Sequence, residues 1–504
     1  MSLLEIRNLS VIYRTPNGPV RAVDDVSLNV EQKEHLGIIG ESGCGKTTLI
    51  RALVRVLPRN GEIASGEIRF KGRNLVELSA QEMRELRWRE IATVPQASMD
   101  ALDPVQRVGR QLETILRVRG GRDPRAAKRR AADLFDLVGL DTGRLENYPH
   151  EFSGGMKQRA VIAMALALDP SLLIGDEPLT ALDVIVQDQV LEVFKRLETE
   201  LDLTVMLVTH DISVVAQVCD TVSVMYAGRV VEQAPAQPFF ESPYHPYSLG
   251  LQQAFPTLVR PKEVLVSIEG YPPDLHTPPT GCRFAERCPF AQPRCYEVDP
   301  LLEDIAPDHH AACLRADEMD VLRAQALQPQ TWQNTEAARQ YVLNGGRMAQ
   351  SSQTETAVRA TNGNGSTFME VRGVSKRYHI GGGLAGLVRG EKPQTVYAVN
   401  EISFTLKRGE SLGLAGESGC GKSTTGRLLV KLLNPSEGQI VFDGRDFSAM
   451  SGEDLKDFRR RVQLMFQNPF EALNPRFTLY RSLSEPLLIH GWKDERARQA
   501  RILE

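Results

Sequence analysis

Apolar and polar positions in the first 235 residues follow two periodic patterns. Residues 3–30 alternate apolar and polar side chains around a Thr-Pro-Asn-Gly turn, which predicts a pair of antiparallel strands. Short apolar runs predict further strands, and helical periodicity predicts the segments between them. The expected strands are 35–39, 66–71, 91–95, 171–175 and 203–208, and the expected helical segments are 46–57, 80–89, 105–150 and 153–167. This alternation indicates an α/β fold.

Composition excludes several classes of protein. The 504 residues are too many for one core, so two or more domains are expected. The formal net charge of −4 gives no general attraction to nucleic acid or anionic lipid. No apolar run approaches the about 18 residues of a spanning helix, and the N-terminus lacks the regions of a signal peptide. We expect a cytosolic protein that reaches any membrane through a partner.

A glycine-rich loop joins the strand at 35–39 to the helix at 46–57. Residues 40–47 match the phosphate-loop pattern G-x-x-x-x-G-K-[ST], and a chance glycine turn is disfavoured because the whole pattern recurs at 416–423. Such a loop directs several backbone N–H groups at one anion, and the helix start adds its positive dipole end. Lys46 would reach the β- and γ-phosphates, and Thr47 would ligate Mg²⁺. The candidate nucleotide-binding residues are Gly40, Glu41, Ser42, Gly43, Cys44, Gly45, Lys46, Thr47 and Thr48.

Polar residues stand at two of the strand ends. The strand at 171–175 is followed by Asp176 and Glu177, and paired carboxylates there are costly unless a metal or a base role uses them. The strand at 91–95 ends at Gln96, which is either a loop glutamine or a residue beside a nucleotide. The arginine-rich helical segment that follows is read as a solvated face, with an acidic partner as the alternative.

A second helix start also has the features of an anion site. Ser153 is a candidate N-cap, and Gly154 and Gly155 leave the first N–H groups of that helix bare. Tyr13 precedes the turn of the first strand pair, where it is either a half-buried strand tyrosine or a surface for an adenine ring.

In order and spacing, these motifs resemble those of an ATP-binding cassette (ABC) ATPase. The match runs from residue 1 to about 235 and includes FSGGM at 152–156, LLIGDEP, TALD at 180–183 and THD at 209–211. Phe152 and Met156 depart from the commonest family form, LSGGQ, but the serine and both glycines are retained. The resemblance implies a phosphate-loop NTPase with a mostly parallel core sheet, an antiparallel β subdomain and a helical subdomain in each cassette.

The resemblance also implies a role for each matching residue. Two cassettes of this family sandwich two ATP molecules head to tail, so the second helix start would serve the partner's nucleotide. Phosphoryl transfer depends mainly on positioning and charge neutralisation. The implied roles are catalysis for Glu177, His210 and Gln96; Mg²⁺ binding for Thr47, Gln96 and Asp176; adenine stacking for Tyr13; and the dimer seam for Ser153, Gly154, Gly155 and Asp183.

Residues 236–327 form a distinct tail after the cassette of residues 1–235. Ser-Pro-Tyr-His-Pro-Tyr-Ser at 242–248 is dense in proline, which predicts a non-helical connection. It resembles the tail of oligopeptide and dipeptide importer ATPases, nickel and glutathione relatives included. Four cysteines follow with spacing C-x5-C-x6-C-x17-C, and four thiolates can hold zinc or a [4Fe–4S] cluster. The resemblance favours the cluster over zinc or plain reduced thiols at Cys282, Cys288, Cys295 and Cys313.

A polar, apolar-poor segment at 328–366 predicts a flexible linker before a second copy. Residues 367–504 repeat the order of the first strand, the phosphate loop and the strand-end glutamine. The corresponding nucleotide contacts are Tyr378, Gly416, Glu417, Ser418, Gly419, Cys420, Gly421, Lys422, Ser423, Thr424 and Gln467, with Ser423 and Gln467 as Mg²⁺ ligands.

The second copy is expected to be truncated before the signature and the acidic strand end. After Gln467 there is no SGG helix start, no Asp-Glu pair and no His-Asp pair. We expect a fragment of a longer gene product; the alternatives are a working dimer of two first cassettes and an inactive remnant. The isolated chain is expected to hydrolyse ATP poorly unless a partner cassette is added.

The resemblance implies an ATP-binding and ATP-hydrolysing subunit that energises import of peptides or related small solutes. It would lie on the cytoplasmic face of the inner membrane, with two transmembrane permeases, an extracytoplasmic solute-binding protein and a partner nucleotide-binding domain. One rival is a non-transport ABC ATPase on ribosomes or DNA, but no basic arm predicts nucleic-acid binding. The other is a regulatory module, which Glu177 and His210 disfavour for the first half.

Overall fold

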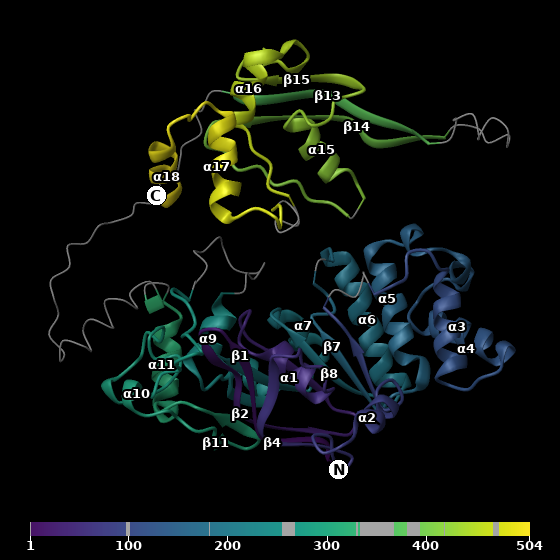
Figure 1. Ribbon diagram of the computed structural model, residues 1–504, viewed down its shortest axis with the longest axis vertical. Coiled ribbons are helices and arrows are strands. Elements are labelled where there is room, and N and C mark those ends of the chain that lie inside the picture. Colours follow the sequence, from purple (N-terminus) through teal and green to yellow (C-terminus); the bar gives the residue numbers. More distant parts are fainter. Residues whose placement is uncertain are drawn as a thin grey trace. The chain divides into compact units, whose positions relative to one another are not determined.

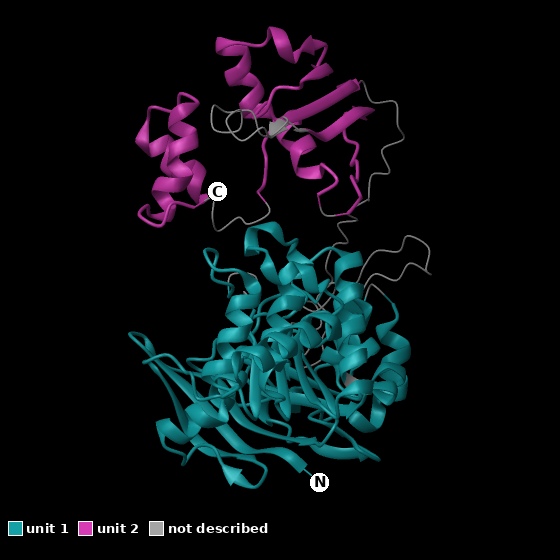
Figure 2. Ribbon diagram, turned by 90° about the vertical axis from the view of Figure 1, so that its right-hand side faces the viewer, with its two compact units in different colours: residues 1–352 teal, residues 353–504 magenta. Residues whose placement is uncertain are grey.

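The chain forms two compact units, residues 1–352 and 353–504 (Figure 2). The computed structural model describes residues 2–96, 101–180, 182–254, 268–328, 331–332, 367–380, 394–417, 419–466 and 473–504. The predicted linker at 328–366 lies almost wholly outside these ranges, as do Ser418 and Gln467. The domain limits at 235 and 327 stay predictions.

An eight-stranded sheet forms the centre of the first unit (Figure 1). Its five strands from β9 to β6 are parallel, and the other three are antiparallel. The central strands are buried throughout because helices and a second sheet cover both faces, which is why they read as continuous apolar runs. The order is β11 (Glu303–Ala306), β12 (His309–Ala311), β10 (Arg229–Pro235), β9 (Thr221–Tyr226), β3 (His35–Ile39), β8 (Thr204–Thr209), β7 (Leu172–Asp176) and β6 (Ile91–Val94).

Alternate residues of the central strands enter two different cores. In β8, Val205 and Leu207 join the core that holds the helical segment, whereas Met206 and Val208 join the core under the second sheet. This is the two-residue period of a strand whose faces are both buried. The second sheet is antiparallel and comprises β2 (Gly18–Glu31), β1 (Ser2–Thr15), β4 (Gly61–Phe70) and β5 (Arg73–Asn74).

The helices of the first unit up to residue 165 fall within the predicted segments, with shorter ends, whereas the helices from residue 184 onward were not predicted. The helix expected to reach residue 57 ends at Leu53, because Arg55 adopts a φ of 51° that leaves the helical region. The helices are α1 (Lys46–Leu53), α2 (Ala80–Leu86), α3 (Val108–Val118), α4 (Pro124–Leu137), α5 (Gly154–Ala165), α6 (Val184–Glu200), α7 (Ile212–Val218), α8 (Ala236–Glu241), α9 (Pro246–Gln253), α10 (Pro293–Glu297) and α11 (Met319–Ala326). None of the helices in the described ranges has the length and apolar character needed to cross a bilayer.

The tail differs from its sequence prediction at the start of one helix, and it adds two strands to the core sheet. The segment 242–248 is not wholly non-helical, since α9 begins at Pro246. Proline is tolerated at the first helical position, where its missing N–H would have no helical partner, and His245 caps the helix by accepting from the N–H of Tyr247. The tail strands β11 and β12 continue the core sheet beside β10, so the tail is part of the first unit.

The second unit has a four-stranded antiparallel sheet and a small core. Residues 411–417, whose first five positions correspond to β3 in the first copy, form no strand. Leu412 and Leu414 are 47% and 49% exposed, whereas Leu36 and Ile38 of β3 are fully buried. The elements are β13 (Thr367–Ile380), β14 (Gln394–Lys407), β15 (Glu437–Phe442), β16 (Arg445–Asp446), α15 (Lys422–Leu429), α16 (Gly452–Arg461), α17 (Leu479–Ile489) and α18 (Glu495–Leu503).

Candidate active site

The first phosphate loop connects β3 to α1. Gly45 is the N-cap of α1 with a φ of 111°, and Gly40 has a φ of 154°, values that side chains rarely adopt. A Cβ on Gly40 would lie 2.1 Å from the carbonyl oxygen of Met225, and one on Gly45 would lie 2.3 Å from that of Ala22. These two glycines therefore permit the curl that the sequence pattern predicts.

Lys46 is held at the start of the loop by main-chain carbonyls. Its Nζ donates to the carbonyl oxygens of Gly40 at 2.7 Å and Glu41 at 2.9 Å, and only 5% of the residue is exposed. In the described part of the chain no carboxylate pairs with this ammonium group. Its charge therefore stays available to an anion in the loop. Burial also raises the pKa of the neighbouring Cys44 thiol, which favours its neutral form.

Thr47 and Asp176, both predicted to face Mg²⁺, lie together. Asp176 is the last residue of β7, and its Oδ1 accepts from the Thr47 hydroxyl at 3.1 Å. Burial raises the pKa of Asp176 above its ordinary value of 3.8, although the bond from Thr47 opposes this shift. A divalent cation here would favour the ionised carboxylate, so the pair fits an oxygen-ligated Mg²⁺.

The three residues predicted to act in catalysis meet at one carboxylate. Oε2 of Glu177 accepts from Gln96 Nε2 at 3.2 Å, and His210 Nδ1 lies 3.4 Å from Oε1. Glu177 also has a φ of 50°, a conformation that costs a non-glycine residue energy and is concentrated at functional sites. Thr180, the first residue of the TALD motif and one for which the sequence predicted no role, donates to Oε2 at 2.9 Å.

Tyr13 lies beside the helix that begins in the loop. Its hydroxyl is 3.2 Å from Oγ1 of Thr48, and its ring packs over Gly61, where a Cβ would lie 2.7 Å from the ring. The residue is half-buried. This position suits both alternatives drawn from the sequence, so adenine stacking stays a prediction.

Ser153 and Asp183 cap two neighbouring helices away from these bonds. Ser153 accepts from the N–H of Met156 at the start of α5, and Asp183 accepts from that of Val186 at the start of α6. Gly154 and Gly155 are the first two residues of α5. In the described ranges, neither capping side chain hydrogen-bonds to the phosphate loop. Their predicted service to a partner's nucleotide stays untested.

The second phosphate loop reproduces the first one locally. Lys422 Nζ donates to the carbonyl oxygens of Gly416 at 2.6 Å and Glu417 at 2.7 Å. Lys422, Ser423 and Thr424 open α15, and Gly421 is its N-cap with a φ of 102°. In the described part of this unit no carboxylate bonds to Ser423. Gly419 and Cys420 complete the described part of the loop, and Tyr378 lies on β13 with 40% of its surface exposed.

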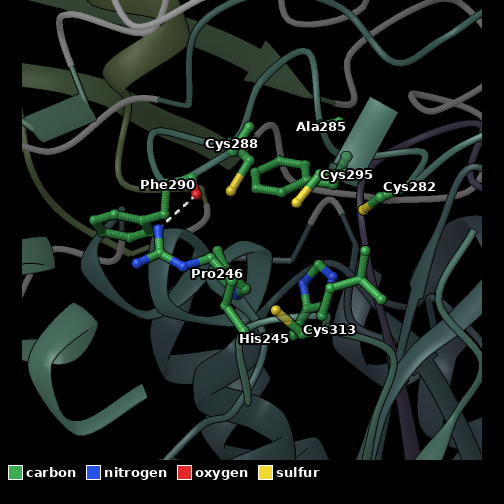
Figure 3. A pocket seen from close by; sticks show the side chains of 12 residues that line it. His245, Pro246, Cys282, Ala285, Cys288, Phe290, Cys295 and Cys313 are labelled. Carbon is green, nitrogen blue, oxygen red and sulfur yellow. Dashed lines mark hydrogen bonds between the residues drawn. The ribbon is translucent and has the colours of Figure 1, made fainter. Parts of the chain in front are cut away.

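The four tail cysteines line one small pocket (Figure 3). Apolar groups supply most of the remaining wall, among them Pro246, Phe284 and Phe290. Burial raises the pKa of Cys282 to about 11 and that of Cys313 to about 12, and it raises the pKa of Cys288 well above its ordinary value. Within the described ranges no three His, Cys, Asp or Glu side chains are arranged to hold a single metal ion. The fourth cysteine, Cys295, is on α10.

Two tail residues that the sequence did not single out contact the phosphate loop. Tyr247 and Arg287 both bond to Glu41, from more than 200 positions away in the chain. The separation is why no local pattern indicated them. Tyr247 belongs to the Ser-Pro-Tyr-His-Pro-Tyr-Ser segment, which was the one available signal.

Comparisons with known proteins agree with this geometry. The ABC transporter family model matches residues 23–180 and 399–503, and the model of the oligopeptide/dipeptide transporter C-terminal region matches residues 231–295. The oligopeptide transport ATP-binding protein OppD of Mycobacterium tuberculosis is 38% identical over 509 residues, which cover 100% of this chain and 79% of that protein.

Two further relatives match most of the chain. The probable peptide ABC transporter ATP-binding protein y4tR of Sinorhizobium fredii is 45% identical over 321 residues, covering 63% of this chain and 96% of the relative. The glutathione import ATP-binding protein GsiA of Pectobacterium atrosepticum is 35% identical over 498 residues, which cover 97% of this chain and 68% of that protein. The chain therefore belongs to the ABC transporter family of ATPases, in the group whose cassette carries the oligopeptide/dipeptide transporter C-terminal region.

Proposed function

We propose that residues 40–48 bind Mg²⁺-ATP and that its hydrolysis energises import of peptides or related small solutes. The observation that carries this proposal is the convergence of Gln96, Thr180 and His210 on the Glu177 carboxylate, beside the Thr47–Asp176 pair. A carboxylate held by three polar groups is placed to orient a water molecule. The match of residues 231–295 to the oligopeptide/dipeptide transporter C-terminal region supports the solute class, as do relatives named for peptide or glutathione transport.

Each side chain has a separate task in this proposal. Lys46 and the loop N–H groups neutralise the β- and γ-phosphates, and Thr47 with Asp176 holds Mg²⁺, which screens charge that develops on the phosphate oxygens. Glu177 accepts a hydrogen bond from the attacking water. His210 contacts the γ-phosphate, and Gln96 reports the occupied site to the transporter.

The proposed setting is the cytoplasmic face of the inner membrane. The chain would bind there through two transmembrane permeases, with an extracytoplasmic solute-binding protein delivering the solute. A partner nucleotide-binding domain would complete each ATP sandwich with residues such as Ser153, Gly154, Gly155 and Asp183. Tyr13 would stack on adenine.

Two variants test the nucleotide site in the full chain. Lys46→Ala should weaken ATP binding at this loop by roughly tenfold or more, because it removes the cation that neutralises the phosphates. Glu177→Gln keeps the shape of the side chain and should retain binding while hydrolysis falls roughly 10²-fold or more. Fluorescent-nucleotide titration and phosphate release measure both. Unchanged nucleotide affinity in Lys46→Ala would refute the proposal.

We also propose that the four cysteines hold a [4Fe–4S] cluster. Four sulfur donors in an apolar wall suit iron–sulfur or zinc. The resemblance of this tail to that of peptide-importer ATPases favours the cluster over a zinc ion, which would bind four sulfurs at about 2.3 Å. A cluster would also compensate the charge of four thiolates in a largely apolar wall.

Metal analysis of the anaerobically purified chain separates the alternatives. About four irons and four sulfides per chain support the cluster. One zinc, or no metal with four reactive thiols, contradicts it. Cys288→Ala should lower the bound iron, whereas Cys219→Ala, which changes a cysteine outside the pocket, should not.

A further inference from the structure

Two residues of the tail hydrogen-bond to Glu41 in the phosphate loop, one to its main chain and the other to its side chain. The N–H of Glu41 donates to the Tyr247 hydroxyl at 2.8 Å. The guanidinium of Arg287 donates from Nη1 to Oε2 of Glu41 at 2.8 Å and from Nη2 to Oε1 at 2.9 Å. Such a two-bond pair fixes orientation as well as distance.

Both tail residues are themselves held in place. Arg287, with a side chain 6% exposed, also donates to the carbonyl oxygens of Ile268 at 3.1 Å and Glu269 at 3.0 Å, and to the Tyr226 hydroxyl at 3.2 Å. Tyr247 is fully buried, and its ring centroid lies 4.7 Å from that of Tyr226. Groups fixed by several bonds and by close packing can position what they contact.

Glu41, which the two tail residues hold, also contacts Lys46, the lysine proposed to bind phosphate. Lys46 Nζ donates to the carbonyl oxygen of Glu41 and to that of Gly40. Glycines at 40 and 43, both with positive φ, make this part of the backbone easy to rotate. A rotation at Glu41 would displace the Lys46 ammonium, and the bonds from Tyr247 and Arg287 oppose it.

The second phosphate loop shows that the loop sequence alone does not create this arrangement. Residues 416–422 repeat the sequence of 40–46, and Lys422 contacts the two corresponding carbonyls. Glu417 is nevertheless exposed, and in the described part of the second unit no tyrosine or arginine bonds to it. The hydrogen bonds that hold Glu41 in the first unit therefore come from the tail and not from the loop sequence.

From this geometry we propose that Tyr247 and Arg287 are positioning residues for Lys46, acting through Glu41. This inference rests on the proposed binding of Mg²⁺-ATP at residues 40–48. Because Arg287 directly precedes Cys288 in the chain, the same contact joins the cysteine pocket to the phosphate loop.

Two conservative variants of the full chain test the proposal. Tyr247→Phe removes one hydroxyl, and Arg287→Met removes the guanidinium but keeps an apolar stem. Each should raise the Kd for ATP by about 3- to 10-fold and raise KM more than it lowers kcat, because Tyr247→Phe removes the acceptor of the Glu41 N–H and Arg287→Met removes the charged pair with the Glu41 carboxylate. Arg294→Met is the matched control, since Arg294 is a tail arginine that donates to the Leu314 carbonyl; it should leave the Kd within about twofold.

A double-variant cycle separates positioning from general stability. If Arg287 acts through Glu41, Arg287→Met combined with Glu41→Gln should weaken binding little more than either change alone. Arg287→Lys, which keeps the charge without the fork, should recover part of the affinity. Wild-type Kd values in folded Tyr247→Phe and Arg287→Met chains, or additive effects in the cycle, would overturn the inference. Lys46→Ala distinguishes the two proposals: if it weakens ATP binding at residues 40–48 while Tyr247→Phe and Arg287→Met do not, only the positioning role fails.

Discussion

At the scale of single residues, the site combines two carboxylates in different surroundings. Glu177 is surrounded by donors, whereas Asp176 is buried against one hydroxyl, and its pKa is raised by that burial. A carboxyl group that is costly to ionise in the empty site becomes favourable when a cation arrives. Asp176 is therefore suited to metal binding, but its ionisation lowers the stability of the nucleotide-free protein.

This cost predicts that Asp176→Asn stabilises the nucleotide-free chain at neutral pH. The folded pKa of Asp176 lies above the ordinary value of 3.8, so the folded state disfavours the ionised form once pH exceeds that value. The melting temperature of the variant should exceed that of wild type at pH 7.5 in EDTA, and the gap should close as pH falls below 3.8. Thermal unfolding at several pH values measures it. A gap independent of pH would show that ionisation is not the cause.

At the scale of elements, the packing of α5 on α6 depends on a missing side chain. A Cβ on Gly155 would lie 2.1 Å from Cγ1 of Val186, so the start of α5 approaches α6 closely. This approach brings the Ser153 cap and the Asp183 cap to neighbouring helix starts. The two glycines of FSGGM therefore serve packing as well as any anion contact.

Gly155→Ala should therefore destabilise the first unit by about 1–3 kcal/mol, the usual cost of overpacking. Gly426→Ala, within α15, is the contrasting change, because its Cβ would lie 3.9 Å from the nearest atom outside that helix, Cδ1 of Leu464. Alanine should there stabilise the second unit by up to about 1 kcal/mol. Denaturant unfolding, followed separately in each unit, measures the effects of the two substitutions. If Gly155→Ala left the free energy of unfolding of the first unit unchanged, α5 and α6 would be able to move apart without cost.

Local patterns predicted the elements better than they predicted the contacts between distant segments. The phosphate loop, β3 and the carboxylates at the end of β7 followed from short motifs, because glycine, apolar runs and strand ends act locally. The start of α9 at Pro246 was missed because proline was read as a helix breaker. The Arg287–Glu41 pair spans 246 positions, and no sequence pattern near either residue indicates it.

At the scale of the whole molecule, the two copies differ in what supports their phosphate loops. β3 is paired with β8 and β9, which the first unit supplies from later in its sequence. Residues 411–417 have no such neighbours among the described residues and form no strand. An apolar strand sequence forms a strand only when neighbouring strands pair with its backbone N–H and C=O groups. The three side chains proposed for catalysis, Gln96, Glu177 and His210, all lie in the first unit.

We therefore expect hydrolysis to require the first cassettes of two chains, or an added partner cassette. Chains with Lys46→Ala lack a working loop, and chains with Ser153→Glu place a negative charge where the sandwich needs an anion contact. Each should be inactive alone. Mixing them pairs the loop of one with the helix start of the other, and random pairing should restore roughly a quarter of the wild-type rate.

The dependence on chain concentration completes this test. Shared sites make the rate per chain rise with concentration until pairing saturates, whereas a site closed within one chain gives a constant rate. Lys422→Ala, which alters only the second loop, should leave the recovery in the mixture intact. If the mixture stays inactive while wild type hydrolyses ATP at a constant rate per chain, the helix start of α5 does not serve a partner, and Ser153 keeps only its role as the cap of α5.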